Sequence, residues 1–220
     1  MTRAAPPRGR IAIVIGAVPE AGPGVGPGTA CGPARGPELG LHAGIAAAVA
    51  RALSGAGAGV VLAGPEGPAL AALAAGINAA GGQAVAVPAD VADPVSVRRL
   101  VEQTLGAFGR LDAAVNHPVN HAGTRAVSVA MASQIPAMRR SGAGGRIVNV
   151  TPSAGPRAAA TIDLTRAAAR DHAGSGVLIN AVAVGPGAGA EEVAAAVLRL
   201  CLDDATPATG ETWHVPHHRP

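Results

Sequence analysis

The sequence contains no lysine and no tyrosine, so no side chain can bring a primary amine or a phenol to a reaction. All 17 strongly basic residues are arginines, whose guanidinium group keeps its proton in proteins. Phe108 and Trp213 are the only large rings, so a core must be built from Ala, Val, Leu and Ile. Such small side chains let helices pack closely on a sheet.

Cysteine and long apolar runs are also scarce. Cys31 and Cys201 lie far apart, which gives neither a metal spacing nor a disulfide framework, so we expect no metal and a cytoplasmic location. The run Ile11–Val18 could imitate a short signal sequence, but it is more typical of a first strand. No stretch reaches the roughly 18 apolar residues of a membrane-spanning helix, so no membrane partner is expected.

The charge pattern does not favour nucleic acid as a partner, because the formal net charge is only +3. The pairs Arg98-Arg99 and Arg139-Arg140 fall in amphipathic segments and are expected on solvated helix faces. Three histidines near the end of the sequence, His214, His217 and His218, are read as a polar tail, since a metal site would need a further ligand.

Short apolar runs alternate with helical periodicity, which is typical of βαβ units and predicts an α/β fold with a parallel sheet. The predicted strands are Ile11–Ile15, Gly59–Ala63, Ala84–Val87, Leu111–Val115, Arg146–Val150, Val177–Val184 and Thr212–Val215. The chain is expected to form one domain over residues 1–220. Its exception is the Gly/Pro-rich segment 18–39, which lacks periodicity and is predicted to be a flexible insertion, either a linker or a lid beside the site.

Apolar side chains at helical spacing predict the covering helices. The stripes are Ile45, Val49 and Leu53; then Leu70, Leu73 and Ile77; then Val97, Leu100, Val101, Leu105 and Phe108. Asp93-Pro94 predicts the start of the third helix, because an aspartate caps the N-terminus and proline fits the first turn. Later helices are predicted at Ala126–Arg140, Ile162–His172 and Glu191–Leu202.

A glycine turn that could approach a phosphate is divided between two places. Gly16 closes the first predicted strand, whereas Gly40, Gly44 and Ile45 stand at the start of the following helix, after the insertion. Glycines between a strand and a helix let backbone N–H groups come close to a bound phosphate.

Later landmarks resemble the short-chain dehydrogenase/reductase family in their order. They are Ala89-Asp90-Val91, Gly109–Asp112 leading into Val115-Asn116, Gly145–Val150, Ile179–Pro186, and Asp203–Thr212. This resemblance runs from Ile11 to about His214. It implies a Rossmann-type doubly wound sheet of about seven strands with helices on both faces, and hydride transfer between ketones and alcohols with NAD or NADP.

The resemblance also assigns a cofactor site, although it does not choose between NAD and NADP. The residues carried over are Gly16, Gly40, Gly44, Ile45, Asp90, Val91, Asn116 and Gly185. Glu66 follows the second strand and could reach a ribose. A small-molecule substrate, or a related protein subunit, and assembly as a homodimer or homotetramer are further expectations.

The residues at the family's catalytic positions depart from the family pattern here. Its serine position falls on Pro152, flanked by Thr151 and Ser153, and its lysine position falls near Ala158. In the family a tyrosine transfers the proton and a lysine lowers the pKa of that tyrosine. The chain is therefore expected to lack the usual reaction and to act as a non-redox catalyst or a non-catalytic partner.

Histidines after the fourth predicted strand leave an alternative open. His117 or His121, together with Asn116 and Ser153 or Thr151, could take over proton transfer in an NAD(P)-dependent oxidoreductase. Either histidine could equally be an incidental loop residue. A third reading makes assembly through the alanine-rich helices the main role.

Overall fold

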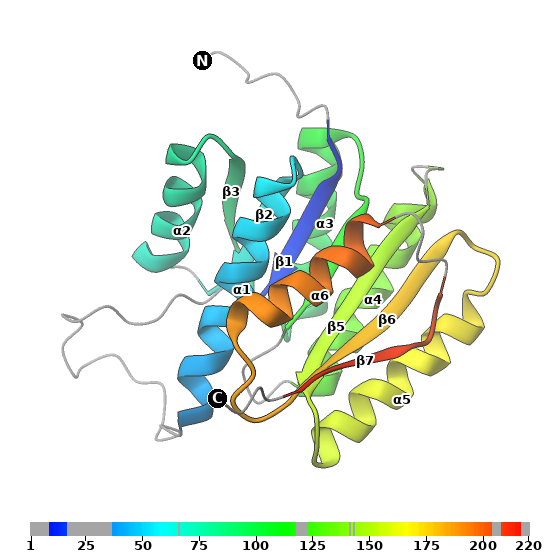
Figure 1. Cartoon of the computed structure of the whole chain (residues 1–220). Coiled ribbons are helices and arrows are strands. Elements are labelled where there is room, and N and C mark those ends of the chain that lie inside the picture. The colour runs from blue at the N-terminus through cyan, green and yellow to red at the C-terminus, as the bar shows by residue number, and fades with distance from the viewer. Residues whose placement is uncertain are drawn as a thin grey trace.

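The computed structural model of the chain describes residues 9–16, 37–65, 67–117, 123–140, 142, 144–203 and 208–216, with the backbone alone for 37–43. Within these residues, seven parallel strands form one sheet with six helices around it (Figure 1). The strands are β1 (Ile11–Ile15), β2 (Gly59–Gly64), β3 (Gln83–Pro88), β4 (Ala113–Asn116), β5 (Gly145–Pro152), β6 (Val177–Val184) and β7 (Thr212–Val215). The helices are α1 (Pro37–Gly55), α2 (Pro68–Ala79), α3 (Pro94–Phe108), α4 (Gly123–Arg140), α5 (Pro156–Asp171) and α6 (Ala190–Leu202).

The strand order β3-β2-β1-β4-β5-β6-β7 confirms the predicted doubly wound sheet. Helices α1, α2 and α6 pack on one face, and α3, α4 and α5 pack on the other (Figure 1). Successive residues of a strand point to opposite faces, so Val14 joins the first layer while Ile13 and Ile15 join the second. Because both faces are covered, the inner strands β1 and β2 are apolar and buried throughout, whereas the edge strands β3 and β7 are partly exposed.

Small residues bring α1 and α6 together over the sheet. A Cβ atom built on Gly44 would lie 3.9 Å from the Cβ of Ala190, and the stripe of Ile45, Val49 and Leu53 is buried beneath it. Alanine lets the helix backbones approach closely, so the few large side chains of this sequence suffice to fill the core.

The N-cap predicted for α3 is confirmed. The Asp93 carboxylate accepts hydrogen bonds from the N–H groups of Val95 at 3.2 Å and Ser96 at 2.9 Å, and Pro94 occupies the first turn. Gly109 ends the helix with φ of 76°, a left-handed conformation that glycine adopts without strain.

Several predicted boundaries differ from the structure, including the starts of β4 and α4, and the differences at α5 and α1 are the most informative. Helix α5 begins at Pro156 rather than at the predicted Ile162. The prediction began too late because the first turn is alanine-rich and carries no apolar stripe. Helix α1 begins at Pro37, inside the segment 18–39 that was expected to be an insertion; positions 18–36 lie outside the described residues.

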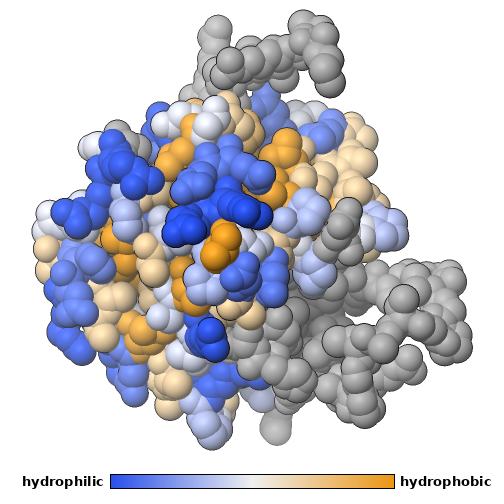
Figure 2. Space-filling view, turned by 180° about the vertical axis from the view of Figure 1, so that it is seen from behind, coloured by the Kyte–Doolittle hydropathy of each residue, from blue (hydrophilic) through white to orange (hydrophobic). Residues whose placement is uncertain are grey.

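Figure 2 shows the side of the molecule on which α3, α4 and α5 cover the sheet. Hydrophilic and hydrophobic residues are interspersed there in small groups. Val85 and Val95 are the exposed large hydrophobic residues of the described chain. No helix among the described residues is long and apolar enough to cross a membrane.

Candidate functional site

The carboxyl ends of β1 and β4 lie side by side where the strand order reverses. In open α/β sheets such a reversal opens a crevice that commonly holds a ligand. His117 follows β4, and its N–H donates to the carbonyl of Ile15 at 3.1 Å. Gly16 ends β1 with φ of 92°, and a Cβ atom there would collide with the carbonyl oxygen of His117. Only glycine therefore allows β1 to turn away so close to β4.

Asn116, the last residue of β4, is fully buried and fully engaged below this crevice. Its side-chain nitrogen donates to Gln134 Oε1 of α4 and to Asn149 Oδ1 of β5, both at 3.0 Å. Gln134 Nε2 donates back to Asn116 Oδ1 at 2.8 Å. The two amides thus form a reciprocal pair, which fixes the end of β4 against α4.

The amide pair continues into a buried chain of hydroxyl groups. Asn149 Nδ2 donates to Thr165 Oγ1 at 3.0 Å, and this hydroxyl donates to the carbonyl of Thr161 at 2.7 Å. Thr161 Oγ1 lies 3.3 Å from Thr124 Oγ1, at the start of α4. A chain of polar contacts therefore links β4, β5, α4 and α5, and buried networks of this kind specify one arrangement of their elements.

The end of β5 carries the hydroxyl groups nearest to the family's serine position. Thr151 is 2% exposed, and its hydroxyl has no hydrogen-bond partner among the described residues. Pro152 and Ser153 are half-buried, and the N–H of Ser153 donates to the carbonyl of Val184 at 2.8 Å. Ala158, in the first turns of α5, is 2% exposed.

Other predicted cofactor residues lie at the ends of β3 and β6. Asp90 is exposed; its carboxylate accepts the N–H of Ala92 at 2.9 Å, while its own N–H donates to Ser96 Oγ at 3.0 Å. Val91 is buried. The N–H of Gly185 is used within the fold, because it donates to the carbonyl of Val215 at 3.0 Å.

The predicted glycine turn is described only in part. Gly44 and Ile45 lie in α1, where Ile45 is fully buried, and Gly40 lies in the same helix. His121 and Glu66 fall outside the described residues. His117 is described and is 2% exposed, so its imidazole reaches little solvent.

Comparison with known proteins shows what this architecture is similar to. The family model for enoyl-(acyl carrier protein) reductase matches residues 40–126. An uncharacterised oxidoreductase of Mycobacterium tuberculosis is 33% identical over 186 residues, which cover 69% of this chain and 70% of that protein. The chain belongs to the short-chain dehydrogenase/reductase family.

Other members of the short-chain dehydrogenase/reductase family are similar over shorter stretches. An A-factor type gamma-butyrolactone 1'-reductase of Streptomyces virginiae is 34% identical over 59% of this chain, and a 2,5-dichloro-2,5-cyclohexadiene-1,4-diol dehydrogenase of Sphingobium indicum is 32% identical over 50%. The matches span 62% and 56% of those two proteins.

Solved structures share the fold over nearly the whole chain. A short-chain dehydrogenase from Mycobacterium smegmatis is 26% identical and superimposes with a TM-score of 0.75, covering 96% of this chain and 93% of that one. A short-chain dehydrogenase/reductase from Burkholderia xenovorans gives the same TM-score at 24% identity, with 94% of each chain covered.

The adenine end of a dinucleotide fits the described residues, since the exposed Asp90 carboxylate has one oxygen engaged by Ala92 and stands at the carboxyl end of β3. On the phosphate side, Gly16 meets the backbone of His117, so its missing side chain first serves the packing of β1 on β4. The family's dinucleotide is thus compatible with the site, with the adenine end better supported than the phosphate end.

The buried polar chain was missed by the reading of the sequence. Gln134 was not singled out, yet it shares a helical stripe with Val127, Met131, Ile135 and Met138, all of which are buried. An amide within an apolar stripe indicates a buried hydrogen-bonded group, because an unpaired one is costly. That spacing was the available signal.

Proposed function

We propose that the chain is a dinucleotide-binding member of the family that does not carry out the usual hydride transfer between ketone and alcohol. It acts instead as a non-redox catalyst or as a partner of another protein subunit. The observation that carries this proposal is the composition: 220 residues hold no tyrosine and no lysine. Assembly as a homodimer or homotetramer is part of the same proposal.

The described residues near the expected catalytic wall support this reading. The family's lysine position falls near Ala158, which is buried and offers a methyl group in place of an amine. The adjacent Arg157 is exposed, but a guanidinium group cannot act as a proton carrier near neutral pH. Pro152, at the serine position, has no hydroxyl.

Neighbouring polar groups are engaged in structure rather than exposed to a substrate. The Asn116 amide makes three hydrogen bonds to Gln134 and Asn149 and is fully buried. This favours a role for Asn116 in holding the end of β4. Thr151 and Ser153 are the hydroxyl groups left at the end of β5, and an unaided hydroxyl is a weak acid and base at neutral pH.

Binding of the dinucleotide would use the opposite side of the crevice. Asp90 and Val91 would hold the adenine, and Gly16 and the start of α1 would meet the phosphates. A bound nicotinamide supplies a hydride donor or acceptor. The residues of this chain would orient the dinucleotide and shield it, without completing the transfer by moving a proton.

Calorimetric titration with NADH and with NADPH tests the binding half of the proposal. We expect saturable binding of at least one of them to the full chain, and an affinity about tenfold weaker in Asp90→Ala, which corresponds to about 1.4 kcal/mol. Asp163→Ala is the matched control, because Asp163 is an exposed aspartate on α5. No binding of either dinucleotide to the wild-type chain would refute this half.

Measurement of turnover tests the second half of the proposal, that the chain does not carry out the usual hydride transfer. The substrates are a panel of carbonyl compounds that includes an A-factor-type γ-butyrolactone and a 3-oxoacyl thioester. The panel follows the similarity to the Streptomyces virginiae reductase and to a 3-oxoacyl-[acyl-carrier-protein] reductase of Synechocystis. We expect no oxidation of NADH or NADPH above the protein-free rate. Turnover at about 1 per second or faster would place the chain among ordinary enzymes.

A second candidate function is supported by the position of His117, directly after β4 at the crevice. In this reading the chain is an NAD(P)-dependent oxidoreductase, and His117 or His121 takes the proton. If the panel shows turnover, His117→Gln and His121→Gln distinguish the two histidines. A rate that neither variant lowers would eliminate this candidate.

A further inference from the structure

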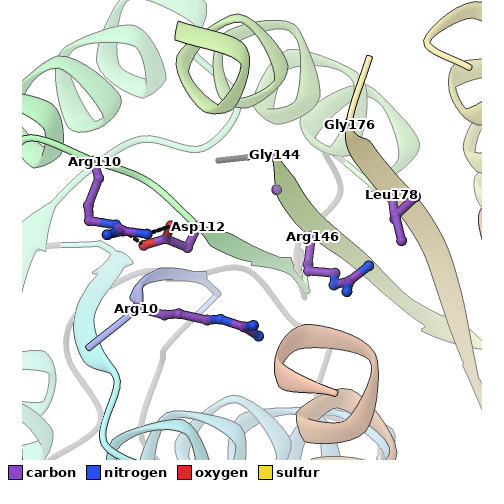
Figure 3. A pocket seen from close by; sticks show the side chains of 8 residues that line it. Arg10, Arg110, Asp112, Gly144, Arg146, Gly176 and Leu178 are labelled. Carbon is purple, nitrogen blue, oxygen red and sulfur yellow. Dashed lines mark hydrogen bonds and ion pairs between the residues drawn. The ribbon is translucent and has the colours of Figure 1, made fainter. Parts of the chain in front are cut away.

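A cavity of about 300 Å³ opens at the amino-terminal edge of the sheet, opposite the carboxyl ends of the strands. The starts of four adjacent strands line it, in the order β1, β4, β5, β6 (Figure 3). Its lining residues are Arg10, Arg110, Asp112, Gly144, Gly145, Arg146, Gly176 and Leu178. Three arginines thus meet one aspartate in a single concave surface.

Hydrogen bonds between the strands hold the floor of this cavity in place. The N–H of Asp112 donates to the carbonyl of Ile11, and the N–H of Arg146 donates to the carbonyl of Asp112, both at 2.9 Å. The N–H of Gly145 donates to the carbonyl of Gly176 at 3.1 Å. The backbone of these lining residues is therefore held by hydrogen bonds between strands, and a ligand would not have to order this backbone.

Two glycines at the start of β5 form part of the cavity wall. A Cβ atom on Gly144 would lie 2.5 Å from the carbonyl oxygen of Gly176, and one on Gly145 would collide with the sulfur of Met138. Larger residues are excluded at both positions by close packing. At these two positions the wall of the cavity is therefore backbone.

The single carboxylate of the cavity is already neutralised. Arg110 donates to Asp112 through Nε at 2.8 Å and Nη2 at 2.6 Å, and the N–H of Ile11 donates to the same carboxylate at 2.8 Å. Asp112 is buried, whereas the Arg110 side chain is 45% exposed. The bidentate pair leaves the outer edge of the Arg110 guanidinium facing solvent at the cavity.

Arg10 and Arg146 are oriented by the end of α6. Arg10 Nη1 donates to the carbonyls of Leu202 at 2.8 Å and Cys201 at 3.2 Å, and Arg146 Nη2 donates to that of Asp203 at 3.4 Å. Figure 3 shows both guanidinium groups extending into the same space. The negative end of the α6 dipole offsets part of their charge. The two cations are thereby held close together despite their mutual repulsion.

We infer that this cavity binds the phosphoryl group of a small phosphorylated metabolite. Guanidinium groups recognise phosphate oxygens with paired hydrogen bonds, and Arg10, Arg110 and Arg146 approach the space from three strands. The volume stands at the lower end of the range for small-molecule sites. The site is separate from the crevice and does not depend on the function proposed above.

Isothermal titration of the full chain with inorganic phosphate and with glycerol 3-phosphate, at constant ionic strength, tests the inference. Leu178 is half-buried on the cavity wall, so Leu178→Glu adds a negative charge without removing an arginine. Leu178→Gln is the matched neutral control. We expect millimolar or tighter binding to the wild type, about tenfold weaker binding to Leu178→Glu, and binding within about twofold of wild type for Leu178→Gln.

A second pair of variants guards against failure of Leu178→Glu to fold. Arg110→Gln removes a lining cation, and Arg99→Gln removes an exposed cation of α3. We expect weaker phosphate binding in the first and unchanged binding in the second. The inference is overturned if neither phosphate compound binds the wild-type chain, or if Leu178→Glu and Arg110→Gln bind as tightly as their controls.

Discussion

Replacing Gln134 by leucine removes one amide of the reciprocal pair and puts an apolar side chain of similar size in its place in α4. Asn116 then keeps only its 3.0 Å hydrogen bond to Asn149, and both the Oδ1 atom and one N–H of its amide lose their partner. Because Asn116 and Gln134 are fully buried, water cannot replace the lost partner without opening the core.

Each buried group left without a partner costs about 1–3 kcal/mol, and the leucine regains part of this through its burial. We therefore expect Gln134→Leu to lower the free energy of unfolding by about 3 kcal/mol. For a chain of this size the midpoint of thermal unfolding should fall by about 6–12 °C.

Chemical denaturation followed by circular dichroism measures this effect, with Gln103→Leu as control, because Gln103 is exposed on α3. The double variant Asn116→Leu with Gln134→Leu should cost less than the sum of the single variants, since it removes both partners together. A loss in Gln134→Leu no larger than that in Gln103→Leu would show that the amide pair does not stabilise the fold.

Two further predictions concern a strained turn and a buried thiol. Gly16→Ala should destabilise the chain by several kcal/mol more than Gly57→Ala. Both glycines have positive φ (92° and 88°), but only at Gly16 would an added Cβ atom collide with His117. Equal losses of unfolding free energy in the two variants would contradict the clash. Burial raises the pKa of the Cys201 thiol to about 12, so the free energy of unfolding should fall as the pH rises from about 9 toward 12. In a Cys31→Ser background, a thiol reagent at pH 8 should label Cys201 only as the chain unfolds. Rapid labelling of the native chain would disprove this burial.

Much of the fold could be predicted because strands and helices of this class carry short-range signals. The bounds of β1, β6 and β7 agree with those predicted. For β1 and β6 the reason is that apolar runs buried on both faces stand out against their flanking glycines. The start of α5 at Pro156 could not be placed, because the turn Pro156–Ala160 has no stripe. Pro156 in the first turn and the alanines after it are local helix signals, but they carry no apolar periodicity.

The sites were less accessible to sequence reasoning because they depend on which strand lies beside which. Arg10, Arg110 and Arg146 are scattered in the sequence, and only the order β1-β4-β5 brings them to one cavity. The role of Asn116 was likewise hidden, since its partner Gln134 comes from a helix that was expected to show polar residues to solvent. Asp90, by contrast, follows β3 where the family pattern placed it.

Isotope transfer tests most directly whether hydride reaches a substrate on this chain. NADH and NADPH carrying deuterium at the transferable position are incubated with the protein and the carbonyl panel, and the alcohols are analysed by mass spectrometry. The account predicts no deuterated alcohol above the protein-free control, although calorimetry shows the dinucleotide bound. Repeated turnovers of deuterated product per protein chain would contradict it.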